Sequence, residues 1–304
     1  MRVTQLEISR NLLTDLEKIN RNFVDVNRQL SSAKKLNFLG DSPIGSADLV
    51  DITEQALRLD AYRFNIISSS YQLRSSESAL NAVYNAFVSI HTLGMTAANE
   101  PINSEGRKAI LNEITILRDE LISRGNTQVN GKYIFAGTAV DIKPFELDNS
   151  DPAYPNGKVI YNGNNNVNTI PVGDGVEVVA GVSGEDAMGA VLKAVDDLIE
   201  KIRNSIDVNG ELEKISGALN DFGNALNELN NARGKVGVSL GMVERMSAMI
   251  DTRNVVLTEQ RSKIEDANIL EVAMRINQLQ TAINAALSSG GAILQQNNLF
   301  DIIG

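Results

Sequence analysis

The strongest constraint on the fold is a heptad pattern that fills roughly the last forty residues of the chain. From Ser262 onward, apolar residues recur at alternating spacings of three and four, which is typical of a helix that packs along another helix. A second apolar stripe, from Ala273 through Leu287 to Leu294, widens this face beyond one seam. A single partner helix would leave part of so wide a face in water, so we expect an assembly. The seam positions are Ile269, Val272, Ile276, Leu279, Ile283, Ala286, Gly290 and Ile293.

The other end of the chain carries a matching pattern, in a helix expected from about Thr4 to about Lys34. Charged residues such as Asp15 and Arg21 occupy the outward positions of this helix. Because two amphipathic helices of the same period pair readily, we expect the two chain ends to form a helical hairpin. We also expect the two seams together to form an assembly interface. The N-terminal seam positions are Leu12, Leu16, Ile19, Phe23, Val26 and Leu30.

Composition limits what such a hairpin can be. Aromatic residues make up only 5% of the 304 residues and tryptophan is absent, so the core must consist mostly of aliphatic side chains on slender helices. The net charge of −10, with no compact basic cluster, argues against nucleic-acid binding. The absence of cysteine excludes disulfides, thiolate metal sites and cysteine nucleophiles.

No apolar run is long enough to span a bilayer, and the first residues, MRVTQLEISRNLL, lack the apolar region and cleavage site of a secretory signal peptide. We therefore expect no membrane partner. If the protein leaves the cell, we expect a route without a cleaved signal.

A break is expected after the first helix, at 38–43. Gly40 permits unusual backbone angles there, Pro43 blocks continuation, and Ser46 is expected to cap the next helix. Further helices are expected from Ala47 to 99–101, from Ser104 to near Gly125 or Gly131, from about Glu185, and from Glu211 onward. The last of these contains glycines at positions 217, 223, 234, 237 and 241, which weaken the helix and which we expect to permit close approach of neighbouring helices.

The character of the sequence changes after Gly131. The segment 133–136 favours β structure, and four of the six prolines fall between Pro144 and Pro171 among many Asn, Gly and Asp residues. Strands are expected at 158–161, 168–172 and 176–182, separated by turns at Asn162-Gly163 and Gly173-Asp174-Gly175.

These elements predict a mainly α fold: an elongated rod of long antiparallel coiled-coil-like helices from both chain ends, with a small inserted β domain. Three parts are expected. They are a terminal helical assembly domain (1–42 and 262–304), a helical rod domain (43–138 and 185–261) and a small outer β domain (139–184).

No group of residues suggests catalysis or a bound cofactor. His91, the only histidine, has no second imidazole or cysteine with which to share a metal, so we interpret it as a satisfied or surface side chain. Glycines 173 and 175 lack the strand-then-helix context of a phosphate loop. We expect no enzyme, no metal site and no cofactor. The acidic residues Asp48, Asp51, Glu54 and Asp60 are interpreted as a solvated helix face, and Asp148, Asp151 and Asp174 as soluble loop positions.

Several sequence motifs, beyond the periodicity, resemble the flagellin superfamily. LSSAKKLNFLGDSP (30–43) is similar to the turn after the first helix of that family, and SKIEDANILEVAMRINQLQTAINAALSSGGAIL (262–294) to its C-terminal helix. GNTQVNGKYIFAGT (125–138), the later KVIYNG and the closing NNLFDII resemble the junction-type members more than ordinary flagellins. Residues 35–41, Lys-Leu-Asn-Phe-Leu-Gly-Asp, depart from the flagellin-like Arg-Ile-Asn-x-Ala-x-Asp-Asp, so an ordinary flagellin is not the expected identity.

The resemblance implies a structural, extracellular subunit of the bacterial flagellum, exported unfolded through the flagellar type III channel, whose terminal helices fold on assembly. It implies four kinds of partner: identical copies, hook-associated protein 1, flagellin, and an export chaperone on the C-terminal helix. Two alternatives stay open at this point, a short flagellin that forms filaments by itself and a secreted display or adhesion module that uses residues 139–185.

Overall fold

The computed structural model describes residues 2–38, 40–99, 102–152, 154–207 and 212–300, and the side chains of 2–6, 8, 9, 207, 212, 213 and 293–300 lie outside that description. Several positions named above also lie outside it: Leu39, Glu100, Pro101, Glu211 and residues 301–303 of the closing motif. The chain forms two compact units, which we call unit 1 (residues 1–58 and 252–304) and unit 2 (residues 59–251). The mainly α fold with small β elements is confirmed.

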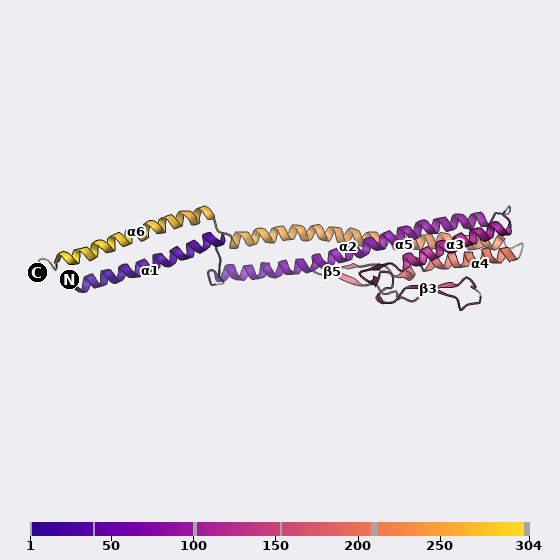
Figure 1. Cartoon of the computed structure of the whole chain (residues 1–304), viewed down its shortest axis with the longest axis horizontal. Helices are drawn as coiled ribbons and strands as arrows, with labels where there is room; N and C mark the ends of the chain where they lie inside the picture. Colours follow the sequence, from indigo (N-terminus) through magenta and orange to yellow (C-terminus); the bar gives the residue numbers. More distant parts are fainter. Residues whose placement is uncertain (1, 39, 100–101, 153, 208–211, 301–304) are drawn as a thin grey trace. The chain divides into compact units, whose positions relative to one another are not determined.

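Unit 1 contains the two ends of the chain. Helix α1 (Arg2–Ser32) and helix α6 (Ile269–Phe300) lie side by side and run in opposite directions (Figure 1). The C-terminal end of α1 and the N-terminal end of α6 are joined by an antiparallel bridge between Lys34 and Asp266. The expected pairing of the two chain ends is therefore present within one chain.

Helix α2 (Pro43–Ala97) begins earlier than the sequence suggested. We expected Pro43 to block the helix and Ser46 to cap it, but Pro43 is the first helical residue. Its fixed φ suits that position, where its missing N–H would have no helical acceptor anyway. Ser42 is the cap instead, because its Oγ accepts a hydrogen bond from the Gly45 amide at 3.2 Å, while Ser46 is buried inside the first turn.

Unit 2 is built around an aliphatic core shared by four helices. The unit 2 part of α2 packs with α3 (Ser104–Gly125), α4 (Ala190–Asp207) and the unit 2 part of α5 (Leu212–Glu265), as Figure 1 shows. A short π-helix, η1 (Glu185–Gly189), leads into α4. Phe87 of α2 stacks on Phe222 of α5 with ring centroids 4.5 Å apart. The long helix predicted from Glu211 onward is confirmed from Leu212, and its apolar residues supply much of this core.

Three separate two-stranded antiparallel sheets make up the β structure of the described residues. The sheets are β1 (Gln128–Val129) with β2 (Lys132–Tyr133), β3 (Phe145–Asp148) with β4 (Lys158–Tyr161), and β5 (Thr169–Gly173) with β6 (Val176–Val179). The turn predicted at 173–175 joins β5 to β6 as a hairpin, whereas Asn162-Gly163 lies between β4 and β5, two strands that do not pair with each other. Strand β4 pairs instead with β3, which the sequence interpretation missed although Phe145 to Asp148 alternates apolar and acidic residues.

A buried ion pair links the β3–β4 hairpin to the helices of unit 2. Arg118 of α3 and Asp196 of α4 have side chains only 2% exposed, and Arg118 Nη1 lies 3.4 Å from Asp196 Oδ1. The same nitrogen donates to the Gly157 carbonyl, and Asp196 Oδ2 accepts from the Val159 amide. Burial raises the pKa of Asp196 above its usual value, because desolvation outweighs the long contact with Arg118.

The glycines of α5 do not play the role expected of them. A Cβ at Gly217, Gly223, Gly234 or Gly237 would have no heavy atom within 4 Å, and one at Gly241 would meet only the end of Arg245. Close approach within the described part of the chain therefore does not explain these glycines.

Candidate assembly interface

The predicted seams line the pair α1/α6, but pairing buries them only in part. Val26 and Val272 are each 6% exposed. Leu30 and Ile269, at the connected end, remain exposed. The side chain of Ile293 lies outside the described residues. The other seam residues are half-buried: Leu12, Leu16, Ile19, Phe23, Ile276, Leu279, Ile283 and Ala286.

Gly290 is the seam position where a glycine matters for helix packing. A Cβ on Gly290 would stand 2.9 Å from Cδ2 of Leu12, closer than real Cβ contacts. The absence of a side chain therefore lets Leu12 fill this position in the seam.

The segment after α1 and the segment before α6 are bonded to each other, and they hold this end of the α1/α6 pair together. Ala33 ends α1 with φ of +56°, a left-handed conformation that is strained for a residue with a Cβ. The Lys35 amide donates to the Glu265 carbonyl at 2.7 Å, and the Ala267 amide donates to the Ala33 carbonyl at 2.9 Å. The Glu265 carboxylate bonds the Lys34 ammonium and the Arg261 guanidinium, and the bond from Lys34 is the main reason why its pKa is lowered. Backbone and charged contacts thus join these two segments.

Asp41 organises the loop that follows. Its carboxylate accepts hydrogen bonds from the amides of Asn37 and Phe38, both at 2.9 Å, and these bonds lower its pKa. The exposed Phe38 ring lies 4.6 Å from the Arg28 guanidinium carbon. This is the segment on which the resemblance to the flagellin turn was based, and its acidic residue has a clear structural task.

Large apolar side chains remain outside the seam on both helices of unit 1. On α6 they are Leu270, Met274 and Leu287, and on α1 they include Leu13 and Val24. Within the second stripe predicted on α6, Leu287 is exposed and Ala273 is half-buried. The intrachain pair therefore leaves apolar surface on each helix in water.

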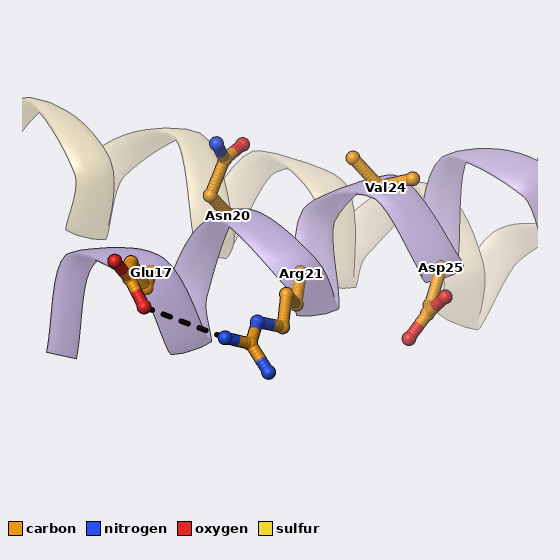
Figure 2. A pocket seen from close by; sticks show the side chains of 5 residues that line it. All are labelled: Glu17, Asn20, Arg21, Val24 and Asp25. Carbon is orange, nitrogen blue, oxygen red and sulfur yellow. Dashed lines mark hydrogen bonds and ion pairs between the residues drawn. The ribbon is translucent and has the colours of Figure 1, made fainter. Parts of the chain in front are cut away.

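The hollow found along the described part of α1 is open to solvent. Figure 2 shows a shallow hollow beside this helix, lined by Glu17, Asn20, Arg21, Val24 and Asp25. Val24 is the only apolar residue among the five, and Arg21 pairs with Glu17 at 3.4 Å. Such an open, charged surface is suited to contact with water or another chain.

The described residues contain no cluster of three or more acidic or histidine side chains that could hold a metal ion. His91 is half-buried, and its ring lies 5.4 Å from the Phe222 ring. Asp174 accepts a hydrogen bond from the Tyr62 hydroxyl at 2.9 Å. The four acidic residues interpreted as a solvated face, Asp48, Asp51, Glu54 and Asp60, are exposed. Within the described ranges, no helix combines the length and apolarity needed to cross a membrane.

Comparison with known proteins gives family-level matches at both ends of the chain. The model of the bacterial flagellin N-terminal helical region matches residues 3–140, and the model of the bacterial flagellin C-terminal helical region matches residues 219–302. These two segments include α1 and α6, the pair described above.

Two curated relatives carry the name flagellar hook-associated protein 3. The one from Salmonella typhimurium is 23% identical over 144 residues, which are 47% of this chain and 45% of that protein. The one from Escherichia coli is 27% identical over 118 residues, which are 38% of this chain and 37% of that protein. The chain thus matches less than half the length of each of these relatives.

Solved structures with the same fold include a putative flagellar hook-associated protein from Vibrio parahaemolyticus, at a TM-score of 0.66, 18% identity, and coverage of 74% of this chain and 100% of that one. Xanthomonas campestris FlgL matches at a TM-score of 0.60 and 16% identity, covering 69% of this chain and 99% of that one. Identities this low establish the shared fold alone. The two family models, which together span most of the chain, show that it belongs to the flagellin superfamily.

Proposed function

We propose that this protein is a structural subunit of the bacterial flagellum, located outside the cell, that joins hook-associated protein 1 to the flagellin filament. The names of its curated relatives support this place in the flagellum. The observation that carries the mechanism is the partial burial of the seams, because α1 and α6 pair and still leave apolar residues exposed. Neighbouring subunits would cover that surface, so incorporation is driven by apolar burial.

The interface residues of this proposal are the two seams named above, which interlock within a subunit and between subunits. In this proposal, residues 1–42 and 262–304 form the assembly domain, residues 43–138 and 185–261 form the helical rod, and residues 139–184 form an outer β domain. Further partners in the proposal are identical copies and an export chaperone that binds the C-terminal helix during type III export. The protein has no catalytic task in this scheme.

Deleting the gene in the native host tests the proposed place in the flagellum. Electron microscopy should show bare hooks, and the culture medium should contain shed flagellin monomers, because filament subunits would be exported with nothing to grow on. Normal filaments would rule the junction role out and favour a minor flagellin or a displayed module.

Charge substitutions test the proposed mechanism. Phe23→Asp or Ile276→Asp places a carboxylate in the half-buried seam, where an unpaired charge is costly, so both variants should fail to enter the flagellum while unit 2 stays folded. Asn20→Asp is the matched control, because it adds the same charge to the exposed polar hollow beside α1 and should be incorporated. Wild-type incorporation of both seam variants would contradict the interlocking mechanism.

A further inference from the structure

An exposed apolar face lies on the part of α2 that belongs to unit 2. Phe64, Ile67 and Tyr71 are 72%, 61% and 66% exposed. With Ala61 and Ser68 they form a patch without charge, which we call the α2 face. An aromatic-rich, charge-poor surface has the composition of a protein interface core.

The other sides of this helix are already occupied within the chain. Ile66 and Leu73 are buried in the core of unit 2. Asn65 donates to the Pro171 carbonyl at 2.8 Å, and Tyr62 donates to Asp174, so a second side contacts the β5–β6 hairpin. The α2 face is the remaining, exposed side of this helix. Its three large side chains expose on the order of 400 Å², a patch size that marks interaction sites.

Helix α5 carries an exposed stretch that is rich in glycine. Gly234, Gly237, Val238 and Gly241 lie along its outer side, and we call them the α5 trough. A Cβ at Gly234 or Gly237 would meet nothing within 4 Å, so the chain's own packing does not require these glycines. Glycine in an exposed helix lowers helix stability, whereas large side chains from a partner can pack closely on it.

The spacing of the two surfaces matches. Phe64 and Tyr71 are seven residues apart, as are Gly234 and Gly241, which is about 10 Å along a helix in each case. Two large side chains on α2 can therefore meet two glycines on α5 at the same time.

The direction of the helices and their charges fit as well. Within the chain α2 and α5 run antiparallel, as the ion pairs Arg74–Glu244 and Arg63–Asp251 establish. Two copies that point the same way would therefore set α2 of one antiparallel to α5 of the next. When Phe64 meets Gly241 and Tyr71 meets Gly234, the same register places Asp60 opposite Arg245.

Asp60 and Arg245 are both exposed, and neither forms an ion pair with any part of the chain that the structure describes. A contact between copies in this register would pair the two charges. Charge complementarity thus selects a second copy of this chain as the occupant of the α2 face.

We propose that the α2 face of one copy packs into the α5 trough of a second copy. Because the two surfaces differ, the contact is head-to-tail and repeats from copy to copy. The inference deepens the proposed function and rests on it, since it adds a contact in unit 2 to the assembly of the terminal helices. The face is about half the roughly 800 Å² that each partner of a standard interface buries, so it acts alongside the terminal helices.

Disulfide trapping tests this contact cleanly, because the native chain has no cysteine. Ser68→Cys and Val238→Cys are small changes at exposed positions of the two surfaces, which the proposed register brings close enough for a disulfide. The full chain with both changes replaces the native protein in its host, and isolated flagella are oxidised. Non-reducing gels should then show a ladder of dimers, trimers and larger species, whereas each single variant should remain monomeric.

Two matched controls sharpen the result. Ser123→Cys combined with Val238→Cys keeps two exposed cysteines but moves one to α3, and it should give no ladder. Adding Gly241→Leu to the Ser68→Cys/Val238→Cys chain fills the trough and should abolish the ladder. Gly217→Leu, at another α5 glycine where a Cβ would meet nothing within 4 Å, should preserve it.

An incorporated double variant without a ladder would overturn the α2–α5 contact and leave the proposed function intact. A dimer from Ser68→Cys alone would also overturn it, because the α2 faces would then meet each other. If the wild-type protein is missing from isolated flagella, the proposed function fails. The same variants, purified and oxidised at high concentration, then decide the contact by the same ladder.

Discussion

At the level of single residues, charged side chains join segments that are far apart in the sequence within each unit. Arg118 and Asp196 connect α3, α4 and the β3–β4 hairpin through a pair that water does not reach. Glu265 connects the segment that precedes α6 to the segment that follows α1, through its carbonyl and its carboxylate. Neither group lies in a heptad seam, so neither belongs to the proposed assembly interface.

Removing one member of the buried pair should be far more damaging than replacing both. Asp196→Ala leaves the buried Arg118 guanidinium with only the exposed Asp119 carboxylate, 3.8 Å away, as a counter-charge; breaking a buried pair typically costs about 3–5 kcal/mol of unfolding free energy. Arg118→Met combined with Asp196→Leu removes both charges and should cost much less. Urea unfolding followed by circular dichroism measures the difference. Equal losses from the two variants would show that the pair acts by packing alone.

Glu265 should make stability depend on pH in the acid range. Its pKa is lowered in the folded state, mainly by the Lys34 hydrogen bond, so its contribution is present above the unfolded value of about 4.3 and is lost as pH falls through the folded value. Glu265→Gln should therefore lower the unfolding free energy by about 1–2 kcal/mol at pH 7, and this loss should be smaller near pH 3. Melting curves of both proteins at the two pH values provide the measurement, and a gap that stays constant with pH would refute the linkage.

At the level of elements, helix ends and helix glycines show that the effect of a residue depends on its position in the fold. Pro43 starts α2 and Ser42 caps it, while Ala33 ends α1 in a left-handed conformation. The glycines of α5 fall into open space, whereas Gly125 at the end of α3 sits against the Phe145 ring. A side chain added at Gly217 of α5 should therefore be tolerated, whereas one added at Gly125 of α3 should clash with its neighbours.

Two glycine-to-alanine variants separate these situations. Gly217→Ala meets no neighbour and restricts the unfolded chain, so it should raise the unfolding free energy by about 0.5–1 kcal/mol. At Gly125 a Cβ would stand 2.5 Å from Cδ2 of Phe145, so Gly125→Ala should lower stability. Thermal denaturation of the two variants beside wild type checks both signs. A loss of stability at Gly217 would mean that this glycine has a partner within the folded chain.

At the level of the whole molecule, the two units differ in how much apolar surface they bury. The core of unit 2 contains many fully buried side chains, including Leu73, Leu80, Val195 and Leu198. In the seam of unit 1, Val26 and Val272 are the buried members among those described. Local opening is easiest where few apolar contacts must be broken, so unit 1 should open before unit 2.

Limited proteolysis of the full chain should reveal this difference. A brief trypsin digest should cut within α1 and α6 first and leave a resistant fragment that spans most of residues 59–251. Mass spectrometry identifies the fragment. Cuts that appear at the same rate in both units would contradict the expected order, and assembly into flagella should protect the terminal helices.

The sequence by itself determined the elements whose signal is periodic. The seams of α1 and α6 and the helix α5 were predictable because helix period and apolar spacing coincide over many turns. The last three strands were predictable because β-favouring runs were separated by turn residues. Because the two helical ends share one period, their pairing was also predictable, as was the family through its motifs.

Tertiary structure alone decided which residues meet across long sequence distances. Strand β4 pairs with β3 and not with β5, and Arg118 pairs with Asp196, and periodicity in the sequence indicates neither of these partners. The same holds for the glycines of α5, because a glycine's lack of a side chain does not reveal whether its surroundings are filled or empty. Local propensity acts between neighbours in sequence, whereas burial and packing depend on neighbours in space, and that is why only the folded chain could reveal them.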